Sequence, residues 1–292
     1  MKKKIKIGTR KSLLAMAQTE MVVKAIEAKY PDTEVELVLM NTIGDKILDK
    51  PLESFGGKGA FISEFEAAML SGQIDMAVHS AKDMPICLPV GLSILAVSLR
   101  EDPRDVLVTR KDSPLKENGI VGTSSLRRQI QMEGLYSVQI KNLRGNVGTR
   151  LTKLKNKEYN AIILAAAGLK RLNLLNDEEL NFEYLNEDTF IPAAGQGIIA
   201  VEGRSEGSGI ELLEAWHHTE TMYCLETERE VLKLLNAGCS EPIGVYSNIE
   251  EAQVMLRILY QYQGRIIKES GSAAVEDRLS LAQNLVNKII KS

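Results

Sequence analysis

Apolar positions in the first 98 residues alternate between the two-residue period of strands and the longer period of helices. Strand patterns occur at 5–7, 35–40, 74–78 and 94–97. A helical pattern between the first two strands predicts a buried face made of Leu14, Ala17, Met21, Ala25 and Ile26. A second helix is expected to turn inward Phe61, Phe65, Ala68 and Met69. Strands that alternate with helices predict a parallel sheet covered on both faces.

A second α/β unit begins after the charged segment 100–105, which a proline interrupts. Strand patterns follow at 106–109, 120–122, 138–140 and 161–165, and each of the last three leads into a helical pattern. Segment 191–197 then breaks the pattern before an apolar run at 198–201. These two breaks predict that the chain crosses from one lobe into a second lobe and then returns.

The pattern changes again from residue 217, where one long helix precedes three alternating strand segments and a last helix. The predicted fold class is α/β, with two hinged doubly wound lobes arranged as in periplasmic binding proteins and a small α+β C-terminal domain. Domain 1 comprises residues 1–98 and 195–216, domain 2 comprises 99–194, and domain 3 comprises 217–292.

The composition, 44% hydrophobic and 26% charged over 292 residues, is that of a globular protein with two or three cores. The three cysteines form no CxxC pair and there are only three histidines, so we expect no metal site. The basic N-terminal segment is not followed by an apolar stretch like that of a signal peptide. No apolar stretch elsewhere is long enough to span a membrane. We therefore expect a cytoplasmic protein with no membrane partner and, at a net charge of −3, no nucleic-acid partner.

Three predicted strand ends combine hydroxyl groups with cations, namely residues 9–12, 80–83 and 123–128. In open α/β sheets, ligands gather at such ends, where helix N-termini favour anions. Together with Arg144, Arg150 and Arg171, these ends indicate a cleft for a ligand with several carboxylates or phosphates. The alternatives are ordinary helix capping by the hydroxyls and solvated surface arginines.

The glycine-rich segments match no nucleotide motif. Gly56-Gly57-Lys58-Gly59 lacks the P-loop spacing, and Gly145-Asn-Val-Gly148 is not GxGxxG. The first segment is either a lid over a cleft or a surface loop.

Two single residues are candidates for chemistry. Asp83 is the best acid or base, the alternative being a capping or salt-bridged aspartate. Cys239 lies where a helix gives way to a strand, and is either a small apolar filler or a reactive thiol. His79 is expected to have a structural hydrogen-bonding role.

Six ordered segments resemble the porphobilinogen deaminase (hydroxymethylbilane synthase) family and spread the resemblance over nearly the whole chain. They are Ala77-Val-His-Ser-Ala-Lys-Asp-Met-Pro85, Val121-Gly-Thr-Ser-Ser-Leu-Arg-Arg128, Leu143-Arg-Gly-Asn-Val-Gly-Thr-Arg150, Ala161-Ile-Ile-Leu-Ala-Ala-Ala-Gly-Leu-Lys-Arg171, Pro192-Ala-Ala-Gly-Gln-Gly197 and Gly238-Cys-Ser-Glu-Pro-Ile-Gly244. The resemblance implies a monomeric transferase that adds four porphobilinogens head to tail, with loss of ammonia, to a covalent dipyrromethane primer. Hydrolysis then releases the linear tetrapyrrole hydroxymethylbilane.

The resemblance also implies roles for individual residues. The catalytic residues would be Asp83, Lys82 and Arg10. The dipyrromethane cofactor would be attached through a thioether to Cys239 and held by Asp83, Lys82, Ser80, Thr123, Ser125, Arg127, Arg128, Arg144 and Asn146. The substrate would be bound by Arg10, Ser12, Arg144, Arg150, Arg171, Gln196 and Phe61, with residues 56–61 as the lid.

The sequence departs from the family's usual pattern at Ala81, Ala237, Glu241 and in its short C-terminal tail. None of these departures removes a charged or nucleophilic group. The rival interpretation from another class is a non-catalytic two-lobed anion-binding protein. An α/β regulator that binds an acidic effector is a third, but no helix-turn-helix pattern supports it.

Overall fold

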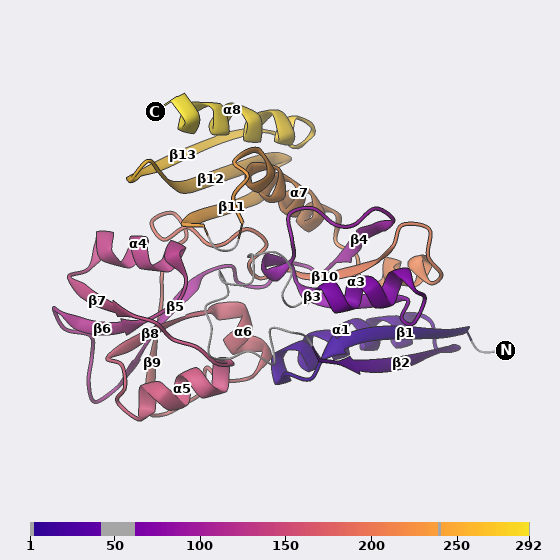
Figure 1. Cartoon of the computed structure of the whole chain (residues 1–292), viewed down its shortest axis with the longest axis horizontal. Coiled ribbons are helices and arrows are strands. Elements are labelled where there is room, and N and C mark those ends of the chain that lie inside the picture. Colours follow the sequence, from indigo (N-terminus) through magenta and orange to yellow (C-terminus); the bar gives the residue numbers. More distant parts are fainter. Residues whose placement is uncertain (1–2, 42–61, 239–240, 292) are drawn as a thin grey trace.

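The computed structural model describes residues 3–41, 62–238 and 241–291, and three separate sheets organise these residues (Figure 1). The first sheet has the strand order β2-β1-β3-β10-β4. Its strands are β1 (Lys3–Arg10), β2 (Thr33–Met40), β3 (Met76–Ser80), β4 (Leu92–Val97) and β10 (Ile199–Arg204). Four strands predicted from the first 98 residues are thus joined by one from far along the chain.

The second sheet repeats this arrangement, with the order β7-β6-β8-β5-β9. Its strands are β5 (Asp105–Arg110), β6 (Gly119–Gly122), β7 (Val138–Lys141), β8 (Ala161–Ala165) and β9 (Leu180–Tyr184). The sequence pattern did not predict β9. Each lobe is therefore a five-stranded α/β unit, and two lobes were predicted.

The expectation of purely parallel sheets is wrong for one strand in each lobe, β10 in the first and β5 in the second. Both are antiparallel to their two neighbours. Each of these strands receives the chain from the other lobe and starts at the carboxyl edge of its sheet. Ile199 pairs with Ser80, the last residue of β3, and Asp105 pairs with Ala165, the last residue of β8. A strand that enters at that edge must run against the others.

Helices cover the two lobe sheets, as the periodicity predicted. They are α1 (Leu13–Lys29), α3 (Ser63–Leu70), α4 (Leu126–Leu135), α5 (Val147–Lys155) and α6 (Ala166–Arg171), with short 3₁₀ turns at η2 (Ala81–Asp83) and η3 (Ile210–Ala215). The segment that contains Phe61 lies outside the described residues.

The predicted buried face of α1 is partly wrong. Met21 is 43% exposed, whereas Gln18 and Thr19 are buried beside Val22 and Ile26. The polar pair is buried because the strand ends satisfy it. Thr19 Oγ1 donates to Thr9 Oγ1 at 2.7 Å, and Gln18 Nε2 donates to Ser80 Oγ at 2.8 Å.

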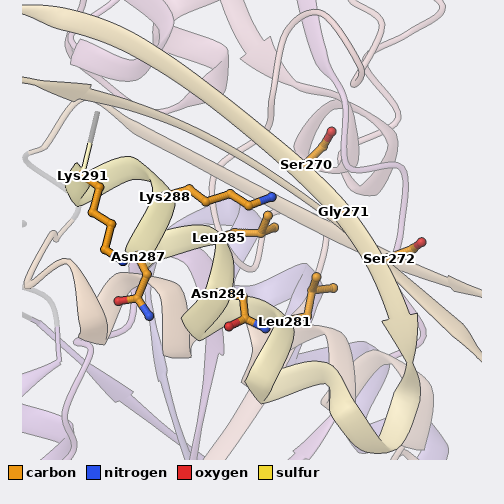
Figure 2. Close-up of a pocket in the computed structure, with 9 residues that line it drawn as sticks. All are labelled: Ser270, Gly271, Ser272, Leu281, Asn284, Leu285, Asn287, Lys288 and Lys291. Atoms are coloured by element: carbon orange, nitrogen blue, oxygen red, sulfur yellow. The ribbon is translucent and has the colours of Figure 1, made fainter.

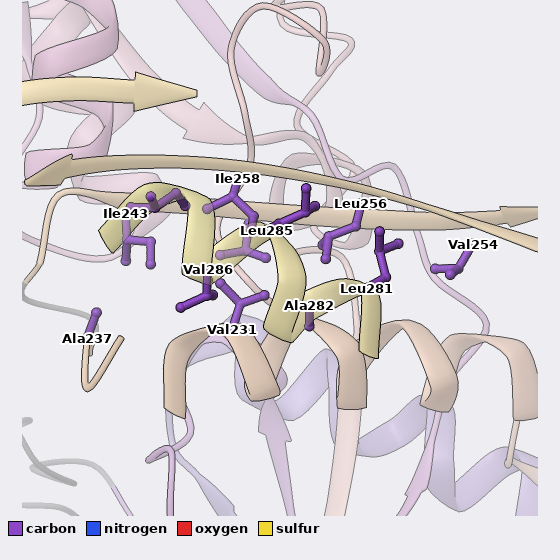
Figure 3. Packing of buried hydrophobic residues seen from close by; sticks show 12 residues of the cluster. Val231, Ala237, Ile243, Val254, Leu256, Ile258, Leu281, Ala282, Leu285 and Val286 are labelled. Atoms are coloured by element: carbon purple, nitrogen blue, oxygen red, sulfur yellow. The ribbon is translucent and has the colours of Figure 1, made fainter. Parts of the chain in front are cut away.

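The third sheet is antiparallel, in the order β11 (Ile243–Glu250), β12 (Gln253–Tyr262) and β13 (Arg265–Ala274). Two helices, α7 (Thr219–Leu234) and α8 (Arg278–Lys291), pack on it, and the 3₁₀ turn η4 (Val275–Asp277) precedes α8. Figure 3 shows the core between sheet and helices, where Val231, Leu256 and Ile258 meet Leu285 and Val286. This is the predicted small α+β domain.

Glu228 of α7 ties this small domain to the crossings between the lobes. Its buried carboxylate accepts five hydrogen bonds: from Arg100 Nη1 and Nη2, from the Gly195 and Ser247 backbone N–H groups, and from Ser247 Oγ, at 2.7–3.0 Å. Arg100 lies in the first crossing and Gly195 in the second. The Glu228 carboxylate therefore joins the third domain to both crossings between the lobes. The exact domain boundaries stay a prediction.

Glycine is required in the second crossing for two reasons. Gly195 and Gly197 have φ of +71° and +88°, which L side chains rarely adopt. A Cβ on Gly195 would lie 3.0 Å from Lys82 N, and one on Gly197 would lie 2.2 Å from the Glu101 carbonyl oxygen. The crossing consequently packs directly against the backbone of the 80–83 strand end.

Within the described ranges, no helix is both long and apolar enough to cross a bilayer. The same residues contain no group of three His, Cys, Asp or Glu side chains placed to hold a metal ion.

Candidate active site

Asp105, the first residue of β5, is the buried centre of a charged cluster at the carboxyl ends of the strands. Its Oδ2 accepts from Arg127 Nη1 at 2.7 Å, and its Oδ1 accepts from Arg128 Nη2 at 2.7 Å and Nε at 3.1 Å. The Asp105 side chain is fully buried, and the two arginines are 4% and 7% exposed. Each guanidinium also donates to a backbone carbonyl, Arg127 Nη1 to Ile191 O and Arg128 Nη1 to Ile163 O.

Burial alone would raise the pKa of Asp105, but the Arg127 and Arg128 guanidiniums outweigh burial and hold that pKa far below its ordinary value. Asp105 is therefore a fixed negative charge. Sequence reasoning had assigned both arginines to the cofactor and had missed Asp105. Two adjacent arginines at the start of a helix were the available signal, because they need a counter-charge once buried.

Gln196 joins this cluster to the first lobe. Its Nε2 donates to Asp105 Oδ1 at 3.1 Å and to Pro103 O at 2.7 Å, and its Oε1 accepts from Lys82 Nζ at 3.4 Å. The hydrogen bonds of the Gln196 side chain thus connect the two lobes. Its predicted contact with substrate stays a prediction.

Lys82 of the first lobe and Arg150 of the second both lie within the electrostatic influence of Arg128 and Asp83. Loss of hydration lowers the pKa of Lys82 to about 8, with Arg128 adding repulsion and Asp83 opposing it. Loss of hydration likewise lowers the pKa of Arg150 to about 10, with repulsion from Arg128 and Arg144 and attraction to Asp83. Asp83 is exposed and lies near enough to both cations to favour their charged forms.

Among the described residues, five cations linked through Arg128 and Arg150 thus lie near two carboxylates. The cations are Lys82, Arg127, Arg128, Arg144 and Arg150, and the carboxylates are Asp83 and Asp105. Arg127 and Arg128 are already neutralised in part by Asp105. Like charges held together in a poorly hydrated region repel one another, so the arrangement favours an anionic ligand.

Several predicted ligand-binding residues instead cap helices. Ser12 Oγ accepts from Ala15 N, Ser125 Oγ from Arg128 N, and Asn146 Oδ1 from Thr149 N, at the starts of α1, α4 and α5. Thr123 Oγ1 accepts from Ser125 N, and Ser80 Oγ bonds Gln18. The capping alternative is thus present at Ser12, Ser125 and Asn146 but not at Ser80, whose side chain makes no cap bond to η2. The contact of all five residues with a ligand stays a prediction.

Arg171 bonds to the second crossing between the lobes. Arg171 Nη2 donates to Gly197 O at 2.7 Å, its buried Nε has no hydrogen-bond partner among the described residues, and loss of hydration lowers its pKa to about 10. Arg10 is the half-buried last residue of β1. Cys239, Phe61 and the proposed lid, residues 56–61, lie outside the described residues, although Gly238 O and Glu241 N, which flank the cysteine segment, are hydrogen-bonded at 3.0 Å.

A groove of about 530 Å³ lies elsewhere, between β13 and α8 in the third domain (Figure 2). Its lining, which includes Gly271, Asn284 and Lys288, contains none of the predicted site residues. Volume alone therefore does not locate the site, and the charged cluster between the lobes remains the stronger candidate.

Comparison with known families decides between the interpretations. Residues 5–211 match the family model described as porphobilinogen deaminase, dipyromethane cofactor binding domain, and residues 222–291 match porphobilinogen deaminase, C-terminal domain. The chain belongs to the porphobilinogen deaminase family. The family match spans the charged cluster and both lobes, and the C-terminal match includes the segment around position 239.

Curated porphobilinogen deaminases resemble the chain over nearly its full length. That of Ruminiclostridium cellulolyticum is 43% identical over 98% of this chain and 98% of its own length. That of Acetivibrio thermocellus is 43% identical over 99% of this chain and 98% of its own. Among solved structures, the BenM effector-binding domain with benzoate aligns with a TM-score of 0.45 at 15% identity over 74% of this chain and 90% of that one, a likeness too weak to assign function.

Proposed function

We propose that this porphobilinogen deaminase family member is a transferase that condenses four porphobilinogens head to tail and releases the linear tetrapyrrole hydroxymethylbilane. Ammonia leaves at each condensation, and the growing chain is anchored on a dipyrromethane primer bound through a thioether to Cys239. The observation that carries the proposal is the excess of positive charge at Lys82, Arg144 and Arg150 beside the exposed carboxylate of Asp83.

The residues present fit a dipyrromethane cofactor. Each of its two pyrroles bears an acetate and a propionate, and the cluster offers cations in a poorly hydrated region where loss of hydration lowers the pKa of both Lys82 and Arg150. Lys82, Arg128, Arg144 and Arg150 would hold these carboxylates. When bound, the cofactor supplies the free α-carbon of its terminal pyrrole as the nucleophile.

The chain's own residues divide the remaining work. Asp83, when protonated, donates a proton to the departing amino group of porphobilinogen, and as a carboxylate it stabilises the positive charge left on the substrate pyrrole. Arg127 and Arg128, clamped by Asp105, keep one wall of the cleft rigid and positive. Lys82 and Arg10 are assigned to orienting the substrate carboxylates, and Ser12, Arg171, Gln196 and Phe61 to further substrate contacts.

A turnover experiment tests the proposal. We expect the purified protein to consume porphobilinogen and to release one ammonia for each molecule consumed, with a linear tetrapyrrole as the product. Binding of porphobilinogen without ammonia release would instead identify a non-catalytic anion-binding protein. The location in the cytoplasm and the monomeric state stay predictions.

A further inference from the structure

A buried contact between a histidine and a carboxylate links two strands next to the 80–83 strand end. His79 of β3 and Glu202 of β10 approach to 3.1 Å between Nε2 and Oε2, with side chains 6% and 0% exposed. The ring of Phe65, from α3, stands perpendicular to the His79 ring with centroids 5.5 Å apart. His79 was expected to have a structural hydrogen-bonding role, and Glu202 has been given no role so far.

The pair is incompletely hydrogen-bonded. Among the described residues, His79 Nε2 and both Glu202 carboxylate oxygens lack a partner in good hydrogen-bond geometry, and the 3.1 Å approach between Nε2 and Oε2 is the polar contact between the two side chains. Buried carboxylates are ordinarily surrounded by donors, as Glu228 is in this same protein. A buried pair without such support is weak evidence for a contribution to stability and calls for another explanation.

The position of the pair supplies that explanation. His79 precedes Lys82 by three residues and Asp83 by four, and β3 ends one residue later at Ser80. Opposite it, Ala200 pairs with His79 and Ile199 with Ser80, and Ala81 N donates to Ile198 O at 3.0 Å. Any slip of β10 along β3 would therefore displace the backbone that carries Lys82 and Asp83.

The pair also contacts the helix above the sheet electrostatically. Burial and the Glu202 charge raise the pKa of Glu66 in α3, whereas His79 lowers it, so Glu66 is the titratable group that faces the pair from that helix. Side chains from α3, β3 and β10 therefore interact electrostatically with one another close to the 80–83 strand end.

We propose that Glu202 is a positioning residue. Through its contact with His79 it holds Lys82 and Asp83 in the geometry that the condensation of porphobilinogen requires. The proposal rests on the proposed function. It assigns Glu202 no contact with substrate and no proton transfer.

The structure offers a control carboxylate on the same two strands. Asp75, just before β3, pairs with Arg204 at the end of β10, with 3.1 Å between Oδ1 and Nη2. Glu202→Gln and Asp75→Asn each remove one negative charge from the β3–β10 pair of strands. Only Glu202 contacts His79, which is the last residue but one of β3 and so lies close along the chain to Lys82 and Asp83.

We expect Glu202→Gln to lower kcat about 10- to 100-fold, with KM for porphobilinogen changed less than about twofold, because misplacement by a fraction of an ångström costs turnover more than binding. Asp75→Asn should keep kcat within about twofold while lowering the thermal midpoint as much or more. Amide hydrogen exchange gives a second readout that needs no turnover. Residues 80–83 should exchange faster in Glu202→Gln and not in Asp75→Asn.

Unchanged kcat and unchanged exchange in folded Glu202→Gln would overturn the proposal, as would equal kcat losses in both variants. If Glu202→Gln does not fold, His79→Gln removes the same contact and meets the same criteria. A wild-type protein that does not turn over porphobilinogen would count against the proposed function. The exchange result would still decide the role of Glu202.

Discussion

Asp83→Ala is expected to leave a folded protein whose kcat for porphobilinogen consumption is lower by a factor of about 10³ or more. Proton transfer by a placed side chain contributes about 10²–10⁴-fold to a rate, and removal of one charge-stabilising group costs about 10²–10³-fold. Asp83 is exposed, so its removal should cost little stability. Initial rates of porphobilinogen consumption and circular dichroism would measure the two effects.

Asp188→Ala is a suitable control for Asp83→Ala, because it too removes an exposed carboxylate paired with a cation. Asp188 Oδ1 lies 2.6 Å from Arg257 Nε, far along the chain from the 80–83 strand end. This control should keep wild-type kcat. Near-normal turnover by Asp83→Ala would contradict the role assigned to that residue.

Asp105→Ala is expected to reduce the free energy of unfolding by about 3–5 kcal/mol, because it leaves two buried guanidiniums without their counter-charge. Arg127 and Arg128 would have to move toward solvent or recruit an anion, and the wall of the cleft would lose its shape. Urea unfolding at pH 7 measures the change. The same variant should hold less dipyrromethane, since its cations are no longer fixed.

The control for Asp105 is Asp112→Ala, which removes an exposed carboxylate from the largely buried Arg110 in the same lobe. Asp112 Oδ1 lies 3.6 Å from Arg110 Nε and its side chain is 72% exposed, so its removal should cost at most about 1 kcal/mol. Equal losses of unfolding free energy in the two variants would contradict the claim that the buried Asp105 cluster contributes more to stability than a pair with an exposed carboxylate.

The effect of Asp105 should also depend on pH. Its pKa in the folded protein is far below the unfolded value of about 3.9, so its contribution is fully present above about pH 4. As pH falls below this value, Asp105 becomes protonated in the unfolded chain but stays ionised in the folded protein. Its contribution to the free energy of unfolding is then lost. The stability difference between wild type and Asp105→Ala should therefore shrink steadily below pH 4. A constant difference down to pH 2 would contradict the assignment.

The sequence predicted the order of elements well because periodicity is a local property. The two lobes, the small third domain and the helix of α8 all follow from apolar spacing. The antiparallel course of β5 and β10 does not, because it depends on which strands the chain meets after each crossing. The buried face of α1 was missed for a related reason, since Gln18 and Thr19 are buried only because distant hydroxyls bind them.

Most of the charged residues in the candidate site were named from the sequence, but not which of them are neutralised by other residues of the protein. Nothing in the sequence distinguished Arg127 and Arg128 from Arg150. In the structure the first two donate to Asp105, whereas Arg150 Nε donates to the backbone carbonyl of Gly145. Asp105 and Glu228 were missed because each acquires its role from residues at least 19 positions away. Spacing along the chain carries no record of such contacts.

The covalent primer is the most direct test of the account, because a non-catalytic anion-binding protein has no need of one. We expect the intact purified protein to weigh more than its sequence by one dipyrromethane, and Cys239→Ser to lack that increment. Cys87→Ser and Cys224→Ser, the matched controls, should retain it. An active protein with the unmodified mass, or a Cys239→Ser variant that keeps the increment, would contradict the assignment of Cys239 as the anchor.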